Sequence, residues 1–268
     1  MYRIGVDLGG TNIAVGVINE ELKIVGRGKV KTKCPRPAEE IFDDIAVAIE
    51  LAVKDAGISM DEVVSVGVGT PGSVNKATGY IEFANNLDFN KVPAKEMLEA
   101  RIHKTVYIDN DANCAALGEA VAGVGKGVSN FVAVTLGTGV GSGIIIGGKI
   151  VNGVNYAAGE MGHMVIVVDG EQCTCGRRGC WEQYASASAL KRFTAQAQLG
   201  NPDSILARVI REHDGHVSGQ SAFMAARLGD PVGQQVCDMY VGYLAAGIAN
   251  VVNIFQPDTL AIGGGVSN

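Results

Sequence analysis

The same glycine-turn pattern occurs twice in this sequence, about half the chain apart, and this repetition limits what the chain can fold into. Each copy has an apolar run, a short turn with two glycines and a second apolar run. The first copy spans residues 2–18 with the turn LGGT, and the second spans 131–146 with the turn LGTG. Apolar runs joined by a short glycine turn predict antiparallel strand hairpins. We therefore expect two related lobes, each offering a glycine hairpin to a shared cleft.

The remaining chain alternates further strands and helices, which predicts an α/β fold. Helices are expected over 38–56, 92–102, 112–122 and 231–255, and Gly57 should end the first of them. Strands are expected over 22–31, 63–68, 106–108 and 259–262. The last helix has an apolar stripe expected to face the core: Val232, Val236, Met239, Tyr243, Leu244, Ile248 and Val252. The expected division is a smaller N-terminal α/β domain, residues 1–112, and a larger α/β domain, residues 113–268.

Composition narrows the class of protein. The chain has 268 residues, of which 47% are hydrophobic and 19% charged, as in soluble globular proteins. A membrane span is not expected, and the first strand begins too early to leave room for a signal peptide. A net charge of −6 without a Lys/Arg cluster argues against a nucleic-acid surface. Six cysteines in a chain of this length do not form a disulfide scaffold, so a cytoplasmic location is expected.

Metal-binding side chains gather between residues 159 and 182. His163 is followed by Cys173, Cys175 and Cys180, and this Cys₃His set matches a closed tetrahedral zinc site. A redox pair would usually read C-x-x-C beside a βαβ pattern, which this stretch lacks. Incidental cysteines are the other interpretation. Because four protein ligands leave no open position on the metal, the expected zinc is structural.

Two acids flank this set, although carboxylates hardly suit a thiolate-rich metal shell. Glu160 lies three residues before His163, and Glu182 follows Cys180 closely. A carboxylate binds a vicinal diol well because its two acceptor oxygens match two O–H donors. A zinc-bound histidine can still use its other ring nitrogen as an oriented donor or acceptor. Solvated loop acids are the alternative, and we favour sugar binding.

The glycine hairpins are candidates for phosphate binding. They match neither the P-loop pattern GxxxxGK[ST] nor GxGxxG at the start of a helix. Glycines without a Cβ let backbone N–H groups approach a phosphate, and Asp7 at a strand end can hold Mg²⁺ through water. An ordinary hairpin turn is the alternative, but two hairpins and a terminal triple glycine favour phosphate. The candidate residues are Asp7, Gly9, Gly10, Thr11, Asn12, Gly137, Thr138, Gly139, Gly264 and Gly265.

Asp111 is the candidate general base. It lies between an expected strand and an expected helix, so a helix N-cap is the simplest role for it. However, Asp109, Asn110, Asp111 and Asn113 supply more polar groups than one cap needs. Phosphoryl transfer to an alcohol requires a carboxylate that accepts the hydroxyl proton. Asp111 fits this role if a hydroxylated substrate binds, and Asn110 would then hold a neighbouring hydroxyl.

Seven motifs together resemble the ROK family of sugar kinases, and among its members the bacterial glucokinases. They occur over nearly the whole chain and in the family's order. The motifs are DLGGTN at 7–12, GTPG at 69–72, NDANCAALGE at 110–119, TLGTGVGSG at 135–143, GEMGH at 159–163, CTCGRRGCWEQYAS at 173–186 and IGGGVS at 262–267.

The resemblance implies an actin-like ATPase (ribonuclease H-like) duplicated fold with two domains and a cleft. It implies ATP across the two glycine hairpins and the Gly263–Gly265 turn, with Mg²⁺ near Asp7. It also implies phosphorylation of glucose by ATP, with Asp111 as the base that takes the proton from the 6-hydroxyl. The sugar-binding residues that it implies are Gly72, Asn86, Asn110, Asp111, Glu160, His163 and Glu182, and the zinc ligands are His163, Cys173, Cys175 and Cys180.

It also suggests a homodimer, and further C-terminal helices that family members carry after the IGGGVS motif. The family's repressors have an N-terminal helix-turn-helix, whereas the first strand here begins at Tyr2, so DNA binding is not expected. The alternatives are a kinase for mannose, fructose, allose or an N-acetylhexosamine, a non-catalytic sugar sensor, and a zinc-stabilised acyl or acetate kinase of the same superfamily.

Overall fold

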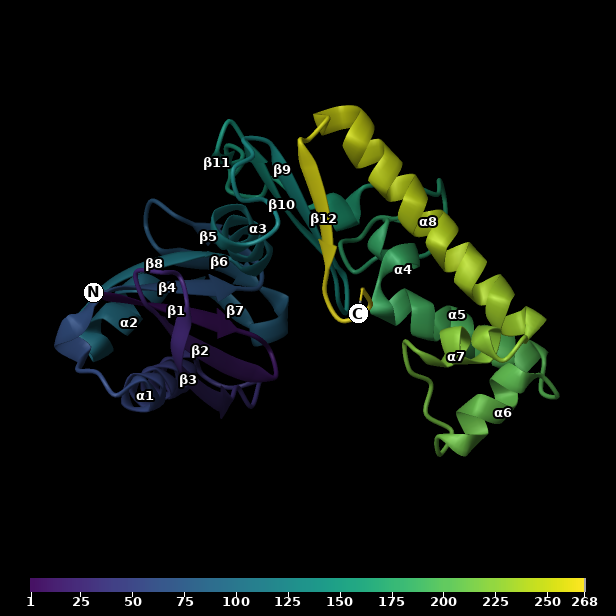
Figure 1. The fold of residues 1–268 in the computed structure, drawn as a ribbon, viewed down its shortest axis with the longest axis horizontal. Coiled ribbons are helices and arrows are strands. Elements are labelled where there is room, and N and C mark those ends of the chain that lie inside the picture. Colours follow the sequence, from purple (N-terminus) through teal and green to yellow (C-terminus); the bar gives the residue numbers. More distant parts are fainter. Residues whose placement is uncertain (268) are drawn as a thin grey trace. The chain divides into compact units, whose positions relative to one another are not determined.

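Two units divide the chain, and each is built on one of the two expected hairpins (Figure 1). The computed structural model describes residues 1–267. The first unit contains Met1–Gly127 and Lys149–Ala158, and the second contains Val128–Gly148 and the chain from Gly159 onward. We expected the division after residue 112. The structure instead keeps helix α3 (Asp111–Ala122) in the first unit, because this helix packs against two strands of the first sheet.

The first unit is centred on a five-stranded sheet with the order β3-β2-β1-β4-β8. The strands are β1 (Tyr2–Leu8), β2 (Asn12–Ile18), β3 (Ile24–Lys31), β4 (Val63–Thr70) and β8 (Thr105–Asn110). Strands β1 and β2 form the expected antiparallel hairpin, and β4 pairs in parallel with both β1 and β8. The carboxyl ends of β1, β4 and β8 therefore meet at one edge, which carries Asp7, Gly69 and Asn110.

Two helices cover this sheet on the side of its core. Helix α1 (Ala38–Ala56) packs on β2 and β3, and α2 (Ala94–Ile102) packs on α1 and β8. Helix α1 buries residues at helical spacing, from Ile41 and Ile45 to Ala52, and Gly57 ends it at a φ of +67°. Both features were predicted from the apolar period and the glycine, and they are confirmed.

The second unit repeats the arrangement of the first hairpin. Strands β9 (Phe131–Leu136) and β10 (Val140–Ile146) are antiparallel, and β12 (Thr259–Gly263) runs parallel to β9. The order β10-β9-β12 thus matches the order β2-β1-β4. The predicted duplication is confirmed at the level of strand pairing.

Helices make up most of the rest of the second unit. They are α4 (Glu182–Ala185), α5 (Ala187–Gly200), α6 (Ile205–Glu212), α7 (Ser221–Arg227) and α8 (Pro231–Phe255). In Figure 1, α8 runs beside α4 and α5, and it contacts α4, α5, α6 and α7. The sequence predicted α8 but not α5, α6 or α7.

Several short elements were also not predicted. Strands β5 (Ser73–Asn75), β6 (Tyr80–Ala84) and β7 (Phe89–Val92) form a small sheet in the first unit, and β11 (Lys149–Ile150) follows β10. Three short 3₁₀ turns are η1 (Met60–Glu62), η2 (Asn85–Leu87) and η3 (Met161–His163). Such strands are too short for their apolar period to stand out, since a run of three to five residues rarely shows alternation clearly.

Helix α8 has the predicted bounds, and the predicted stripe agrees in part with its packed face, since Val236 is buried and Val232, Tyr243 and Leu244 pack against buried clusters. The buried residues are Gly233, Val236, Cys237, Tyr240, Gly247 and Val251, whereas Met239 and Val252 are exposed. Among the described residues, α8 is the one helix long and apolar enough to cross a membrane by length and composition, a test that core helices of globular proteins also pass.

Candidate active site

The structure gathers the candidate site residues into two groups, one in each unit. The first group lies at the carboxyl edge of the first sheet and in the loops beside it: Asp7, Gly9, Gly10, Thr11, Asn12, Gly72, Asn86, Asn110 and Asp111. The second group lies around the second hairpin and the cysteine loop: Gly137, Thr138, Gly139, Glu160, His163, Cys173, Cys175, Cys180, Glu182, Gly264 and Gly265.

Asn110, rather than Asp111, caps helix α3. The Asn110 side-chain oxygen accepts hydrogen bonds from the backbone N–H groups of Ala112 (2.9 Å) and Asn113 (3.2 Å). Its amide nitrogen donates to the carbonyl of Gly72 at 3.0 Å. Asp111 is the first helical residue, and it stays exposed. The simplest role weighed for Asp111, that of a cap, is thus filled by its neighbour. Oδ1 of Asp111 accepts a hydrogen bond from the Ala112 N–H at 2.8 Å, and Oδ2 is the oxygen that remains for chemistry.

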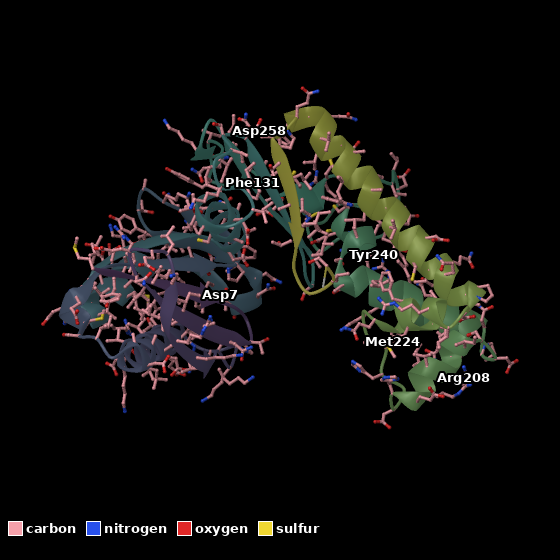
Figure 2. All side chains as sticks on the ribbon, in the orientation of Figure 1. Asp7, Phe131, Arg208, Met224, Tyr240 and Asp258 are labelled. Carbon is pink, nitrogen blue, oxygen red and sulfur yellow. The ribbon has the colours of Figure 1, made fainter. Side chains whose placement is uncertain are left out.

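Asp7 and Asp111 line one cavity of about 810 Å³ within the first unit. Figure 2 labels Asp7, which lies at the end of β1. Desolvation by the surrounding protein raises the pKa of Asp111, a backbone hydrogen bond from Ala112 opposes this shift, and the negative charge of Asp7 adds to it. Desolvation also raises the pKa of Asp7. Two such carboxylates favour binding of a cation, because a positive charge relieves their repulsion.

The β8–α3 junction is held by an ion pair that the sequence did not reveal. Lys76, in the loop after β5, pairs with the Asp109 carboxylate. The same carboxylate accepts hydrogen bonds from the backbone of Asn110 (2.8 Å) and the side chain of Asn113 (3.1 Å). Asp109 thereby stabilises the backbone conformation from which Asn110 and Asp111 project. The one sequence signal for this pair was the basic residue Lys76 near a turn. Such residues are common on protein surfaces, so the pair could not be predicted.

The first hairpin turn is closed by its own backbone. The N–H of Gly9 donates to the carbonyl of Asn12 at 3.0 Å, so this amide is already used within the turn. A Cβ added to Gly10 would lie 3.4 Å from the carbonyl oxygen of Asn86, which places Asn86 beside the turn. The structure therefore brings Asn86 to the hairpin, while Thr11 at its tip remains exposed.

The second hairpin lies against the terminal glycine turn. Gly264 has a φ of +99°, and a Cβ on it would lie 2.4 Å from the carbonyl oxygen of Leu136, where the hairpin begins. Only glycine suits this position, because it tolerates the positive φ and leaves room for the close approach. The N–H of Gly137 donates to the carbonyl of Gly139 at 3.0 Å and closes the turn. The two glycine turns are therefore adjacent in the second unit.

The four expected metal ligands converge. One ligand atom from each of His163, Cys173, Cys175 and Cys180 lies within 4.8 Å of the others. The Cys173 sulfur is 3.6 Å from Nδ1 of His163, and the Cys175 and Cys180 sulfurs are 3.6 Å apart. Ligands held about 2.0–2.3 Å from a tetrahedral zinc ion would be separated by roughly these distances. The donor set and its spacing therefore fit zinc.

Glu182 touches both the metal-ligand cluster and the second hairpin. Its Oε1 accepts a hydrogen bond from the Cys173 thiol at 3.1 Å and lies 3.6 Å from Nδ1 of His163. Its Oε2 would lie 2.6 Å from a Cβ added to Gly139. The side chain is only 16% exposed, so Glu182 is not the solvated loop acid of the alternative interpretation.

Glu160 is exposed, but the backbone on both sides of it is fixed by Ser142. The Ser142 hydroxyl, on β10, donates to the carbonyl of Gly159 and accepts from the N–H of Met161 at 3.2 Å. Ser142 is 6% exposed. Ser142 was not among the predicted site residues. Its place in an apolar strand is a weak signal, because a buried hydroxyl needs hydrogen-bond partners.

The duplicated sheets with paired glycine hairpins define the actin-like, ribonuclease H-like α/β fold, and this is the class of the protein. The chain belongs to the ROK family, whose model matches residues 3–268.

Several glucokinases resemble this chain in sequence and structure. A glucokinase of Streptomyces coelicolor is 42% identical over 99% of this chain and 82% of its own length. A glucokinase of Thermotoga maritima is 37% identical over 98% of this chain and 82% of its own length. The crystal structure of a ROK family glucokinase from Streptomyces griseus in complex with glucose and AMPPNP has a TM-score of 0.85 and 40% identity, covering 100% of this chain and 84% of that protein. The predicted family and fold are confirmed.

Proposed function

We propose that this protein is an ATP-dependent glucokinase that transfers the γ-phosphoryl group of ATP to the 6-hydroxyl of glucose. One observation carries the proposal: Asp111 stands exposed at the start of α3 while Asn110 caps the helix. Oδ1 of Asp111 accepts the Ala112 N–H at 2.8 Å, so Oδ2 is the oxygen that would accept a hydroxyl proton. The similarity to glucokinases supports glucose as the acceptor and ATP as the donor.

In this proposal Asp111 is the general base. A carboxylate is far too weak to ionise an alcohol before the reaction, because the pKa values of the two groups differ widely. Asp111 therefore accepts the proton late, as the sugar oxygen attacks the phosphorus. Most of the rate enhancement then comes from positioning and charge neutralisation. The raised pKa of Asp111 helps, since a stronger base takes the proton more readily.

The N–H groups of Gly9 and Gly137 close their own turns, so other backbone N–H groups of the glycine hairpins and of the Gly264–Gly265 turn would hold the ATP phosphates. Asp7 would hold Mg²⁺, and its carboxylate oxygen suits this hard cation. When bound, Mg²⁺ neutralises charge on the transferred phosphoryl group. The cavity shared by Asp7 and Asp111 is consistent with this assignment, because both acids face it.

The residues proposed for sugar binding are Gly72, Asn86 and Asn110 in the first unit and Glu160, His163 and Glu182 in the second. Asn110 keeps one side-chain N–H beyond its bond to Gly72, so it can still donate to a hydroxyl. Nδ1 of His163 faces Cys173 and Glu182, which leaves Nε2 as the ring atom for a sugar contact.

Zinc would be held by His163 and the three cysteines and would act as a structural ion that orders the loop between η3 and α4. The Cys173 thiol donates to Oε1 of Glu182. Metal ligation requires the thiolate, so Oε1 would lose this donor and become an acceptor for a sugar hydroxyl. The backbone N–H of Arg177 contributes most to lowering the pKa of Cys175 to about 6, which favours the thiolate form.

A coupled ADP assay over a panel of hexoses tests the proposal. We expect glucose-dependent ADP formation, and Asp111→Ala should lower kcat by about 10²–10⁴-fold, the usual contribution of a general base. Exposed Asp203→Ala is the matched control and should retain activity. If the kcat of Asp111→Ala stayed within a few-fold of the wild-type value, the role of Asp111 as general base would be wrong.

The same panel separates the other candidates. Higher kcat/KM for mannose, fructose, allose or an N-acetylhexosamine would reassign the sugar, and glucose binding without ADP release would indicate a sensor. ADP release that is indifferent to glucose would point to an acyl or acetate kinase. We also propose a homodimer, which light scattering would test.

A further inference from the structure

Trp181 joins the cysteine loop to helix α8. It is the one tryptophan of the chain, it is fully buried, and it stands between Cys180 and Glu182. Its indole N–H donates to the carbonyl of Tyr243 on α8 at 3.0 Å. Its backbone N–H donates to the carbonyl of Met164 at 2.8 Å. The side chain and backbone of Trp181 are therefore both fixed.

The indole lies directly on the backbone of α8 at Gly247. A Cβ added to Gly247 would lie 2.0 Å from Cε2 of Trp181 and 2.3 Å from its Nε1. Heavy atoms in contact are normally about 3.5–4.0 Å apart. Any side chain at this position would push the indole away, so the absence of a Cβ is required for the contact.

Two further contacts tie α4 to the same face of α8. Tyr240, labelled on α8 in Figure 2, donates from its hydroxyl to the carbonyl of Ala185 at 2.8 Å. The rings of Tyr184 and Tyr243 have centroids 4.6 Å apart. Helix α4 begins at Glu182 and ends at Ala185, so α8 contacts the residue before it and its last two residues.

These contacts fix the position of Glu182, the first residue of α4. Its carboxylate has little freedom, since Oε1 lies 3.1 Å from the Cys173 sulfur and Oε2 faces Gly139. A shift of the Trp181 backbone moves the first residue of α4 with it. A displacement of about 1 Å at a binding group can cost on the order of 10²-fold in function.

We propose that α8 is the platform that positions Glu182 for the sugar, and that Gly247 and Tyr240 are positioning residues for hexose binding. The assignment of the ligand rests on the proposed function. Neither residue contacts Glu182; each acts through α4, Gly247 by admitting the Trp181 indole and Tyr240 by holding Ala185.

Two alanine substitutions on α8 test this proposal. Gly247→Ala places a methyl group in the indole, whereas Gly242→Ala on the same helix is exposed and meets no other described atom within 4 Å. We expect Gly247→Ala to raise the KM and the calorimetric Kd for glucose by about tenfold or more, with the KM for ATP changed less than about threefold. Gly242→Ala should match wild type in all three quantities.

Trp181 reports its own displacement, because it is the one source of tryptophan fluorescence. Its emission should move to longer wavelength in Gly247→Ala and stay unchanged in Gly242→Ala. Tyr240→Phe, a milder change that removes one hydroxyl, should raise the glucose KM a few-fold while kcat at saturating glucose stays within about twofold. A merely structural role would instead lower the active fraction, and hence kcat, at constant KM.

The outcomes separate this inference from the proposed function. A displaced Trp181 with an unchanged glucose Kd would overturn the platform role of α8, and so would equal effects of the two alanine substitutions. Wild-type protein that binds glucose but releases no ADP would overturn the kinase assignment, while the comparison of glucose Kd values would still decide the role of α8.

Discussion

Replacing Ser142 with alanine should loosen the segment that carries Glu160. The hydroxyl is the bridge between β10 and this segment, since it donates to Gly159 and accepts from Met161. Alanine keeps the strand and removes both bonds. Because Ser142 is 6% exposed, water has little access to its former partners.

The size of the effect follows from the burial of those partners. A buried polar group left without a partner costs about 1–3 kcal/mol. The N–H of Met161 also donates to the carbonyl of Gly159 at 2.8 Å, so neither group is left wholly unpaired and the cost lies at the lower end of this range. We therefore expect Ser142→Ala to lower the free energy of unfolding by about 1 kcal/mol, and to raise the glucose KM because Glu160 lies between the two groups that lose the hydroxyl.

Urea unfolding followed by tryptophan fluorescence is the suitable assay, because Trp181 and Ser142 both belong to the second unit. With a slope of about 1–3 kcal/mol per molar urea, the midpoint should fall by roughly 0.5 M. Exposed Ser129→Ala is the matched control. If Ser142→Ala unfolded at the wild-type midpoint and kept the wild-type glucose KM, the hydroxyl would have no role in holding Glu160.

Three other predictions concern protonation, the metal and the ion pair. The pKa of Asp111 is raised in the fold, so the folded state holds more protons between its ordinary value of 3.8 and the raised one, and stability falls as pH rises through that window. Asp111→Asn should therefore be more stable than wild type at neutral pH, with a gain that disappears as urea unfolding is repeated down to pH 4. Cys175→Ser should lose zinc and glucose affinity together in metal analysis and calorimetry, and tight glucose binding by metal-free protein would contradict this link. Lys76→Met should destabilise the first unit by about 1 kcal/mol, as expected for a partly buried pair. In the ADP assay it should lower kcat while the KM for ATP changes less. An unchanged kcat would show that the pair does not position Asp111.

Elements with a long, regular pattern could be predicted from the sequence. Helix α1 has apolar residues at 41, 45, 48, 49 and 52 and a glycine at its end, and these local signals agree with its environment. The hairpins could be predicted because a glycine turn fixes the pairing of the strands beside it. In both cases the information lies within a few residues of the element itself.

Features that depend on distant residues could not be predicted in this way. The stripe predicted on α8 contained only large apolar residues. It therefore omitted Gly247, which matters because it leaves space for the Trp181 indole. The choice between Asn110 and Asp111 as the cap likewise depends on Gly72, which Asn110 contacts from 38 positions away.

Glu182 shows why the separate motifs are best understood together. In the sequence, the second hairpin, the cysteine set and the flanking acid are independent patterns with independent functions. In the second unit, one oxygen of Glu182 faces Cys173 and His163 while the other faces Gly139 of the hairpin. The residue that reads a sugar hydroxyl in our proposal is therefore held between the metal loop and the hairpin proposed to bind phosphate. In this proposal, a carboxylate in that position would lie between the sugar and the phosphate donor. The cysteine loop would then contribute to catalysis by placing one side chain, without taking part in the chemistry.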